Sequence, residues 1–541
     1  MNEEPPKEIH GAVRWDLSLL LFLGIGLWNL PSLWYPFEPA QALAQVIAKV
    51  ILEGGVPYRD ALDVKPPAIF YLQAGLMALA GDHMHWLRVA DLFSLWVTMV
   101  LMLRVGSEIR GPACGIWGAL LFGLAYPLMG FWKTAQGESF LLPWLWWSLL
   151  LAVRGGGNVG IGKSLQCGTA LGVVWWFKYP YAIPFPFLAL GRLFQAWGRG
   201  SRGGRSPWGS ISLAIGFVGV VGGGGLYLWG IGALGDLWQI TVIQNVGERV
   251  DLVASGTFLR RSALFWASLA EFPLFVLILA LALGGSFFLL KERPRGAWVV
   301  LTYLLGMIAA VELQMRLYHY HVIPLLSVGC LIAGVGLDRL IRSTSRVRIL
   351  ESARARWAIT GAALVLVVMT GLVNHQETYR RWWAYVGKGL SWEAYLATFP
   401  DLSGRYRPFV WEEWEVGQAL RAMEPKERTL LIWGGFTPLV YYFSGLRPST
   451  PFLYTNFITV KGPWGEGWMR RLTDSVSARP PGVVVLLKSG DLGDTLRDLQ
   501  GSVPVLYDLL HSSYSLEAKL GPFFIYQRLA EKEPLERPGG P

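Results

Sequence analysis

The dominant pattern along the chain is a series of apolar runs, each close to the length of a membrane-spanning helix. Such a helix needs about 20 apolar residues, with a range of about 17–25. The segment 66–81 is apolar but short and begins with Pro66-Pro67, so we interpret it as an interfacial or re-entrant helix. The remaining runs predict a polytopic α-helical membrane protein with about 11 transmembrane helices, at residues 16–35, 87–104, 113–131, 138–153, 163–178, 179–195, 208–233, 263–290, 297–312, 322–341 and 357–373.

From residue 374 the long apolar runs stop and strand-like and helix-like segments alternate. Short apolar runs at 429–433, 483–487 and 523–526 predict strands, and the patterns at 412–423, 464–476 and 491–500 predict helices. Such alternation is typical of a small α/β domain. We therefore expect a transmembrane domain over 1–373 and a soluble C-terminal α/β domain over 374–541, joined by the polar and aromatic stretch 374–407.

The basic residues between the apolar runs follow one side of the predicted membrane. Cytoplasmic loops carry an excess of Lys and Arg. With a cytoplasmic N-terminus, the gaps on the cytoplasmic side contain Arg104, Arg110, Arg154, Lys163, Arg192, Arg199, Arg202, Arg205, Lys291, Arg293, Arg295, Arg339, Arg342, Arg346, Arg348, Arg354 and Arg356. The C-terminal domain is then extracytoplasmic, and the outward gaps, rich in Tyr, Trp, acids, His and Pro, are the expected active face.

Composition supports the membrane assignment and excludes some classes of function. Hydrophobic residues make up 53% of the chain and charged residues 16%, compared with about 25% charged in soluble domains. The net charge of +10 arises from loops that set orientation, and no basic patch with interleaved aromatics is present, so we expect no nucleic-acid partner. Cys114, Cys167 and Cys330 lie in separate apolar runs, which predicts neither a disulfide framework nor a zinc site.

The first outer loop, 36–86, concentrates the polar side chains that could carry chemistry. Apolar positions along 39–53 share one face, which predicts a helix lying on the membrane surface, and Gly54 is placed to end it. The chain then returns towards Glu38. We therefore expect three carboxylates and two cations at the membrane boundary, namely Glu38, Asp60, Asp63, Arg59 and Lys65.

The segment PYRDALDVKPPAIFYL, 57–72, resembles the first-loop signature of GT-C membrane glycosyltransferases, in the branch of protein-mannosyltransferases and aminoarabinose transferases. Four later segments fit the same branch in order, although only the first-loop motif is fairly specific. They are Gln136-Gly137-Glu138-Ser139-Phe140, Trp175 to Tyr179 with its Lys178, Arg316 to Tyr320 followed by Pro324, and Ile432-Trp433-Gly434-Gly435 with Tyr441 to Arg447.

The resemblance implies transfer of a hexosyl or pentosyl group from a polyprenyl-phosphate donor to a lipid, glycan or protein acceptor on the outer face. In the family, a first-loop acid takes the proton of the acceptor hydroxyl while the lipid phosphate leaves. Cations must stabilise that phosphate, and the candidates are Arg59, Lys65, Lys178, Arg316 and His319. The branch that the chain resembles is bacterial, and the resemblance therefore implies that this protein lies in the plasma membrane of a bacterium. No cofactor is indicated, and a divalent metal ion stays open.

The acid itself departs from the family pattern. Counted back from Leu52-Glu53-Gly54, it falls near Ala40-Gln41, and the nearest acid, Glu38, comes two residues early. Either Glu38 serves after a small shift, or Asp60, Asp63 or Glu138 serves instead, or transferase activity has been lost.

Each candidate also has a structural interpretation. Glu38 and Glu138 can complement helix N-termini, Asp60 and Asp63 can solvate a loop, and Lys65 can extend to the interface. Arg316 can pair with Glu312, four residues earlier. His319 and His321 alternate as a metal-binding pair would, but with no third ligand nearby, interfacial hydrogen bonding is the simpler interpretation.

Two further classes of function compete with the enzyme. A transporter or flippase often has repeated halves with interrupted helices, and this chain shows no such internal symmetry. A non-catalytic membrane assembly protein is the other alternative, and the displaced acid keeps it open.

Overall fold

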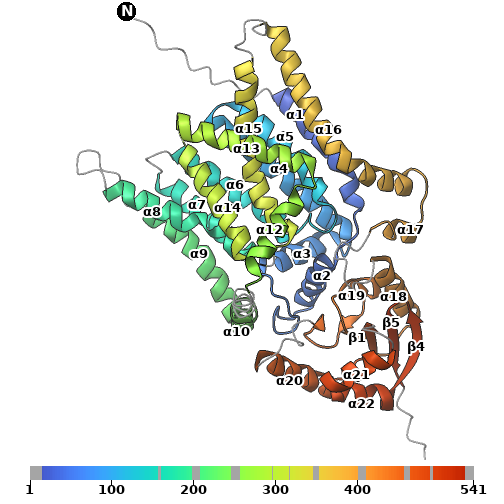
Figure 1. The fold of residues 1–541 in the computed structure, drawn as a ribbon. Helices are drawn as coiled ribbons and strands as arrows, with labels where there is room; N and C mark the ends of the chain where they lie inside the picture. The colour runs from blue at the N-terminus through green and yellow to red at the C-terminus, as the bar shows by residue number, and fades with distance from the viewer. Residues whose placement is uncertain are drawn as a thin grey trace, which may run out of the picture.

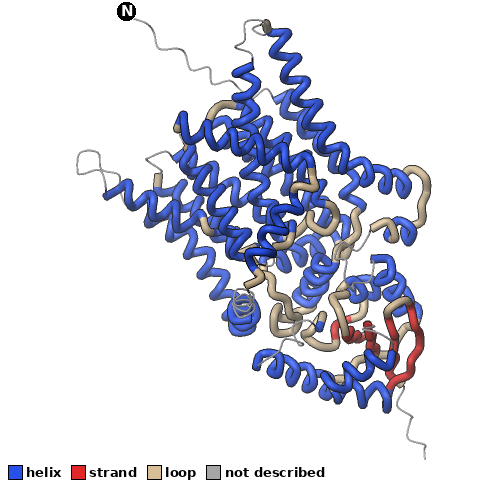
Figure 2. The backbone as a smooth tube through the Cα atoms, in the orientation of Figure 1, coloured by secondary structure: helices blue, strands red, loops and turns tan. Residues whose placement is uncertain are grey.

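The structure, a computed structural model, describes residues 15–155, 160–197, 208–244, 256–294, 296–315, 317–344, 352–399, 410–455, 463–487 and 492–529. A bundle of long helices occupies one part of the molecule. A smaller unit, which contains the five-stranded sheet, lies beside one end of the bundle (Figures 1 and 2).

The helical part begins with α1 and ends with the long helix α16. Its elements are α1 (Trp15–Asn29), η1 (Leu30–Trp34), α2 (Pro39–Leu52), α3 (Ala68–Ala80), α4 (Met84–Ile109), α5 (Pro112–Ala125), η2 (Tyr126–Met129), α6 (Gly137–Gly155), α7 (Ile161–Phe177), η3 (Tyr179–Ala182), α8 (Pro184–Trp197), α9 (Trp208–Gly230), α10 (Leu234–Leu237), η4 (Trp238–Gln244), α12 (Phe258–Leu269), α13 (Pro273–Glu292), α14 (Ala297–Leu313), η5 (His319–Val322), α15 (Ile323–Thr344) and α16 (Ala353–Val386).

Fewer helices qualify as spans by length and composition than the sequence predicts. Within the described residues, five helices are long and apolar enough to cross a membrane, or six if a bent pair in α16 is counted as one span. The predicted number of about 11 is therefore not confirmed, although a helix covers at least part of every predicted run. One contributor to the difference is α14, which covers a predicted run and is apolar but only 17 residues long.

The predicted run 263–290 overlaps one candidate span, Pro273–Glu292, but it is not a single helix. The structure divides this run into α12 and α13, with Ala270–Phe272 between them. Pro273 opens α13 after Phe272 in an extended conformation, and a proline is well placed in the first helical turn but breaks a helix interior. The continuous apolar character of the run conceals this break.

Glycines let neighbouring helices approach closely where α7 crosses α9. A Cβ atom on Gly168 would lie 2.0 Å from the carbonyl oxygen of Leu213, and one on Gly216 would lie 2.1 Å from that of Leu165. Small residues at such crossings bring helix backbones into contact. The pair therefore depends on two glycines facing one another's backbones.

The bundle has two chemically different ends, as the charge distribution predicts. At one end Arg110 and Arg339 both pair with Glu292, and Arg154 pairs with Glu108 at 2.8 Å. These arginines come from gaps that the sequence assigns to a single side. The first outer loop, the loop 130–136 and the unit with the sheet meet at the other end.

The C-terminal part forms a small five-stranded sheet with helices around it. Its elements are α17 (Trp392–Leu396), α18 (Val410–Ala422), β1 (Thr429–Trp433), α19 (Leu439–Ser444), β2 (Arg447–Pro448), α20 (Pro463–Ala478), β3 (Val483–Leu487), α21 (Leu492–Ser502), α22 (Pro504–Ser513), β4 (Tyr514–Leu520) and β5 (Phe523–Arg528). The strand order is β2-β1-β3-β5-β4, with β1 parallel to β2 and β3, and β5 antiparallel to β3 and β4.

Strands occur at all three predicted positions, and the structure adds β2 and β4. The five residues of β3 are all buried, as expected for a central strand covered on both faces.

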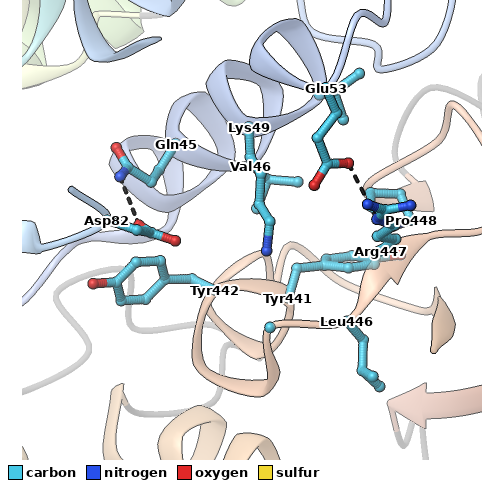
Figure 3. A pocket seen from close by; sticks show the side chains of 12 residues that line it. Gln45, Val46, Lys49, Glu53, Asp82, Tyr441, Tyr442, Leu446, Arg447 and Pro448 are labelled. Atoms are coloured by element: carbon cyan, nitrogen blue, oxygen red, sulfur yellow. Dashed lines mark hydrogen bonds and ion pairs between the residues drawn. The ribbon is translucent and has the colours of Figure 1, made fainter. Parts of the chain in front are cut away.

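The C-terminal part packs against the first outer loop rather than standing apart from it. The N–H of Leu62 donates to the carbonyl of Pro451 at 2.9 Å, and Arg447 pairs with Glu53 at 3.2 Å. A small pocket remains between α2 and the segment from α19 to β2, and Figure 3 shows Lys49 lying between the Gln45–Asp82 and Glu53–Arg447 pairs. The apolar face of α2 thus meets protein, with Leu43 and Ile47 fully covered.

Candidate active site

Glu38 is the N-cap residue of α2 and is buried, with 2% of its surface exposed. Pro39 occupies the first helical position, and Gln41 completes a capping box in which its Oε1 accepts from the N–H of Glu38 at 3.1 Å. The side chain of Glu38 also reaches the loop 130–136, which we call the second outer loop, where Gln136 Nε2 donates to its Oε1 at 2.6 Å. Capping therefore accounts for only part of what this carboxylate contacts.

Lys65 returns to the start of α2, as the loop pattern predicts. Gly54 ends the helix with a φ of 86°, and Tyr58 holds the following turn because its buried hydroxyl donates to the carbonyl of Lys65 at 2.7 Å. The Nζ of Lys65 then donates to the carbonyl of Ala40 at 3.2 Å. This contact places one cation of the loop close to Glu38.

Asp63 is buried between the first outer loop and the C-terminal part. Its Oδ1 accepts from the N–H of Val64 at 2.7 Å and from the hydroxyl of Tyr454 at 3.3 Å. Its Oδ2 is buried and has no hydrogen-bond partner among the described protein atoms. Burial raises the pKa of this carboxyl, and the charges of Lys65 and Lys178 oppose that rise.

Glu138 and Lys178 form a mostly buried ion pair at the start of α6. Their Oε1 and Nζ atoms lie 3.0 Å apart, with 2% of the glutamate side chain and 18% of the lysine side chain exposed. His321 Nε2 lies 3.9 Å from the same oxygen, and Lys178 lies over the ring of Tyr320 at 5.6 Å. Because Asp63 is also within the electrostatic reach of Lys178, we name Asp63, Lys65, Glu138, Lys178 and His321 the cation–carboxylate cluster.

Arg59 and Asp60 are not brought together with this cluster. They pair with one another at 2.9 Å on an exposed turn, with 50% and 37% of their side chains exposed. Asp60 also accepts from the N–H of Val56 at 2.7 Å. The hydrogen bond from Arg59 lowers the pKa of Asp60, so this carboxyl is a weaker base than an isolated one. Arg471 of α20 donates to the carbonyl of Arg59 at 2.7 Å.

His319 lies beside the cluster but binds another element. Its Nε2 is 2.7 Å from the hydroxyl of Ser268 in α12, and its ring stacks on Phe265. Arg316 lies outside the described residues. Glu312, its predicted structural partner, accepts hydrogen bonds from Ser262 and from Trp266, the latter at 2.6 Å.

The described part of the chain contains no group of three or more His, Cys, Asp or Glu side chains that could hold a metal ion. His319 contacts Ser268 of α12, whereas His321 lies beside Glu138. The pair therefore does not converge on one point, in keeping with the interpretation of separate polar contacts.

Sequence reasoning missed the polar side chains that join the loops. Arg88 of α4 is 1% exposed and donates to the carbonyl of Pro36 at 2.6 Å and to Gln41 Oε1 at 2.8 Å. Tyr454 was missed as well, although it contacts Asp63 across 391 positions of sequence. The position of Arg88 in the first turn of a predicted span could have marked it as a residue with buried partners. A cation at such a position is costly unless other groups pair with it.

Comparison with known proteins supports the fold. No protein-family model matches the chain, and no curated protein sequence matches it significantly. The solved structure of ArnT from Cupriavidus metallidurans bound to undecaprenyl phosphate is similar over 95% of this chain and 98% of its own, with a TM-score of 0.56 and 15% identity. The same protein in the apo state gives a TM-score of 0.55 over the same shares, again at 15% identity.

A weaker likeness extends to the archaeal oligosaccharyltransferase AglB from Archaeoglobus fulgidus, with a TM-score of 0.48 and 12% identity over 97% of this chain and 75% of that one. This likeness is too slight to carry an argument. ArnT is an aminoarabinose transferase of the GT-C fold, and it matches this chain nearly end to end. The fold expected from the resemblance is therefore confirmed: this chain has the GT-C fold, in the form that ArnT has.

Proposed function

We propose that this chain is a glycosyltransferase that moves a sugar from a polyprenyl-phosphate donor to an acceptor on the outer face of the membrane. The observation that carries the proposal is the cation–carboxylate cluster, which lies where the first and second outer loops meet in a chain with the ArnT fold. The undecaprenyl phosphate bound to ArnT is the model for the donor lipid. The sugar is a hexosyl or pentosyl group, and the acceptor is a lipid, glycan or protein.

Lys65 and Lys178 are the proposed partners of the donor phosphate. Both lysines lie within the electrostatic reach of Asp63, and Lys178 keeps 18% of its side chain exposed even while paired with Glu138. Two ammonium groups at this position stabilise the charge that develops on the phosphate as the bond to the sugar breaks. Arg316 and His319 stay candidates from the sequence, with Arg316 outside the described residues, whereas the exposed pair of Arg59 with Asp60 leaves Arg59 the weakest of the candidates.

Glu38 is the proposed general base. Glu138 is paired with Lys178 at 3.0 Å, and Asp60 is paired with Arg59, whereas Glu38 opens the first-loop helix as its N-cap and accepts a hydrogen bond from the neutral amide of Gln136. The acceptor oxygen attacks the anomeric carbon, its proton passes to the Glu38 carboxylate, and the carbon–oxygen bond to the phosphate breaks. Polyprenyl phosphate then leaves with the bonding electron pair. Asp63, which is buried with one oxygen that accepts no hydrogen bond from the described residues, is the alternative base.

The proposed setting is the plasma membrane of a bacterium, with the N-terminus cytoplasmic and the C-terminal part outside. This orientation puts the cation–carboxylate cluster at the outer surface, where a lipid-linked donor and an external acceptor meet. The two chemically different ends of the bundle support it.

The decisive test is glycosyl transfer in liposomes with radiolabelled polyprenyl-phosphate sugars and a cell-envelope extract as acceptor. We expect labelled product from the wild-type protein and a loss of at least about a hundredfold in Glu38→Gln, since general-base catalysis contributes about 10²–10⁴-fold. Glu53→Gln, at the other end of the same helix, is the matched control and retains activity.

Each outcome of this test separates the alternatives. Equal product from wild type and Glu38→Gln would remove Glu38 as the base and move the role to Asp63, with Asp63→Asn, Asp60→Asn and Glu138→Gln as the next variants. No product with any donor, together with flux of the lipid-linked sugar across the vesicle membrane, would contradict the transferase and indicate a flippase.

A further inference from the structure

The proposed base is held by a loop other than its own. Gln136, 3% exposed, donates one side-chain hydrogen bond to Glu38 Oε1 at 2.6 Å and another to the carbonyl of Trp132 at 3.2 Å. Its amide is therefore anchored within the second outer loop while it points at the first. A donated hydrogen bond of this kind favours the charged form of a carboxyl group.

A second pair of side chains locks the two loops together around this contact. Arg88 donates to Pro36 and Gln41 on the first-loop side, and it approaches the hydroxyl and the carbonyl of Thr134 on the second-loop side at 3.3 and 3.5 Å. Gln41 spans the same gap, because its Nε2 donates to the carbonyl of Thr134 at 2.7 Å. Both residues are almost fully buried.

The contacts of Gln41 explain why the first-loop acid does not occupy the position that the family pattern gives it. Gln41 is one of the two positions where the spacing of the first loop places the family acid, and here its amide carbonyl accepts from both Glu38 N–H and Arg88. A carboxylate at this position would lie against the guanidinium of Arg88 and be neutralised by it. In this chain position 41 anchors the loop, and the first-loop acid stands two residues earlier than the family position, at Glu38, in contact with Gln136.

We propose that Gln136 is a positioning residue for Glu38, and that Arg88 and Gln41 set its place by clamping the first outer loop to the second. The inference rests on the proposed role of Glu38 as general base. Gln136 holds the carboxylate ionised and in one orientation, so that the base is ready when an acceptor hydroxyl arrives. Without the amide donor, Glu38 binds its proton at a higher pH and fewer molecules carry an active base.

Three charged groups belong to the segments around Glu38 and Gln136, and the test must separate their effects from that of Gln136. Arg88 lies in α4, and its charge interacts with that of Glu38. Lys65 donates to the carbonyl of Ala40, two residues along the chain from Glu38. Glu138 opens α6, two residues after Gln136. None of these groups changes when Gln136 is replaced by a neutral side chain of similar size.

The experiment compares wild type, Gln136→Met and Gln45→Met. Methionine has nearly the shape of glutamine but cannot donate. Gln45 supplies a matched control in α2, the helix that Glu38 caps, since its buried amide donates to the carboxylate of Asp82 at 2.8 Å. The titration midpoint of Glu38 is followed by infrared difference spectroscopy, with its band assigned from Glu38→Gln, and the pH profile of transfer is measured in parallel.

We expect Gln136→Met to raise the titration midpoint of Glu38 by about one to two pH units, because hydrogen bonds to charged groups are of that strength. The acidic limb of the pH–activity profile should move upward by the same amount, and Gln45→Met should leave both unchanged. Gln136→Glu, which adds a second carboxyl beside the first, should move both further in the same direction. It also keeps the test valid if Gln136→Met fails to fold.

An unchanged Glu38 midpoint in both Gln136 variants would overturn the inference, whatever their activity. The spectroscopic titration needs no turnover, so it stands even if the wild-type protein transfers no sugar. The two failures are therefore distinct: loss of transfer in the wild type contradicts the proposed function, and an unmoved midpoint contradicts the role of Gln136.

Discussion

At the scale of single residues, Asp63 is a buried carboxylate whose hydrogen bonds are incomplete among the described residues. It is buried, and one of its oxygens has no protein hydrogen bond among the described residues. Buried carboxylates with incomplete partners carry a cost in stability, and such costs concentrate at functional sites. Asp63 therefore fits a ligand-facing role better than a solvated loop, which its sequence context also allowed.

The pKa of Asp63 leads to a prediction about stability. Burial raises the pKa of this carboxyl in the folded protein, so the folded state binds its proton more tightly than the unfolded state does. The resulting stabilisation is fully present below the unfolded value of about 3.9 and is lost as the pH rises through the folded pKa. Asp63→Asn removes this loss, and we expect its thermal midpoint at pH 7.5 to equal or exceed that of the wild type.

The measurement is thermal unfolding in detergent at pH 4.5 and at pH 7.5. The difference between the thermal midpoints at the two pH values should be smaller in Asp63→Asn than in the wild type. A lower midpoint for Asp63→Asn at pH 7.5 would show that the charged form stabilises the fold.

The sequence supplied the chemistry of the site but not its neighbours. Glu38, Asp63, Lys65, Glu138 and Lys178 were all recognisable from one-dimensional motifs, and the structure gathers four of them with His321. The side chains that hold them, Gln136, Arg88 and Tyr454, contact partners 98, 47 and 391 positions away. Local spacing carries no information about such pairings, because they depend on how the loops fold against one another.

At the scale of elements, the crossing of α7 and α9 depends on close backbone contact. Gly168→Ala would push a methyl group to within 2.0 Å of the carbonyl oxygen of Leu213, so the helices must separate. We expect a loss of at least about 1–3 kcal/mol, the usual cost of overpacking, measured as a lower thermal midpoint and less protein recovered in the membrane fraction.

Gly219→Ala is the matched control for this substitution. Gly219 lies in α9, one turn beyond Gly216, and an added Cβ there would meet nothing within 4 Å. Alanine favours helix over glycine by about 0.5–1 kcal/mol, so this variant should be as stable as the wild type or slightly more so. Equal stability of Gly168→Ala and Gly219→Ala would contradict the close contact of the two helices.

The ends of helices were predictable from the sequence where a proline or glycine sets them. Other helix ends were not. Pro39 and Gly54 delimit α2 close to the predicted limits, because a proline starts a helix well and a glycine takes the positive φ at its end. By contrast, α16 continues to Val386, 13 residues past the predicted end at 373. Its later turns are polar and aromatic, so hydrophobicity alone could not reveal that the helix continues.

At the scale of the whole molecule, the C-terminal part contributes directly to the site. Tyr454 donates to Asp63, and the backbone contact of Leu62 with Pro451 holds the same stretch of loop. The sequence predicted the presence of an α/β unit but not its position, because nothing in its strands indicates which surface they pack against.

Tyr454→Phe tests this long-range contact. The ring packing on Phe436, 4.7 Å between centroids, should survive, whereas the hydrogen bond to Asp63 is lost. A bond worth about 1 kcal/mol corresponds to about a fivefold fall in kcat, measured in the liposome transfer assay. Tyr526→Phe, in β5 of the same unit, should match the wild type. Undiminished transfer by Tyr454→Phe would mean that the contact of the two parts does not act through Asp63.

The three cysteines have a consequence for studying the molecule in a membrane. Cys114, Cys167 and Cys330 are the whole thiol content of the chain, and all are buried. A water-soluble maleimide therefore meets no reactive group on the native surface, and a single cysteine introduced at Lys291 or Lys388 would be the one site that it labels. Labelling of intact cells against opened ones then reports which end of the bundle faces the outside, in a protein that otherwise keeps its natural sequence.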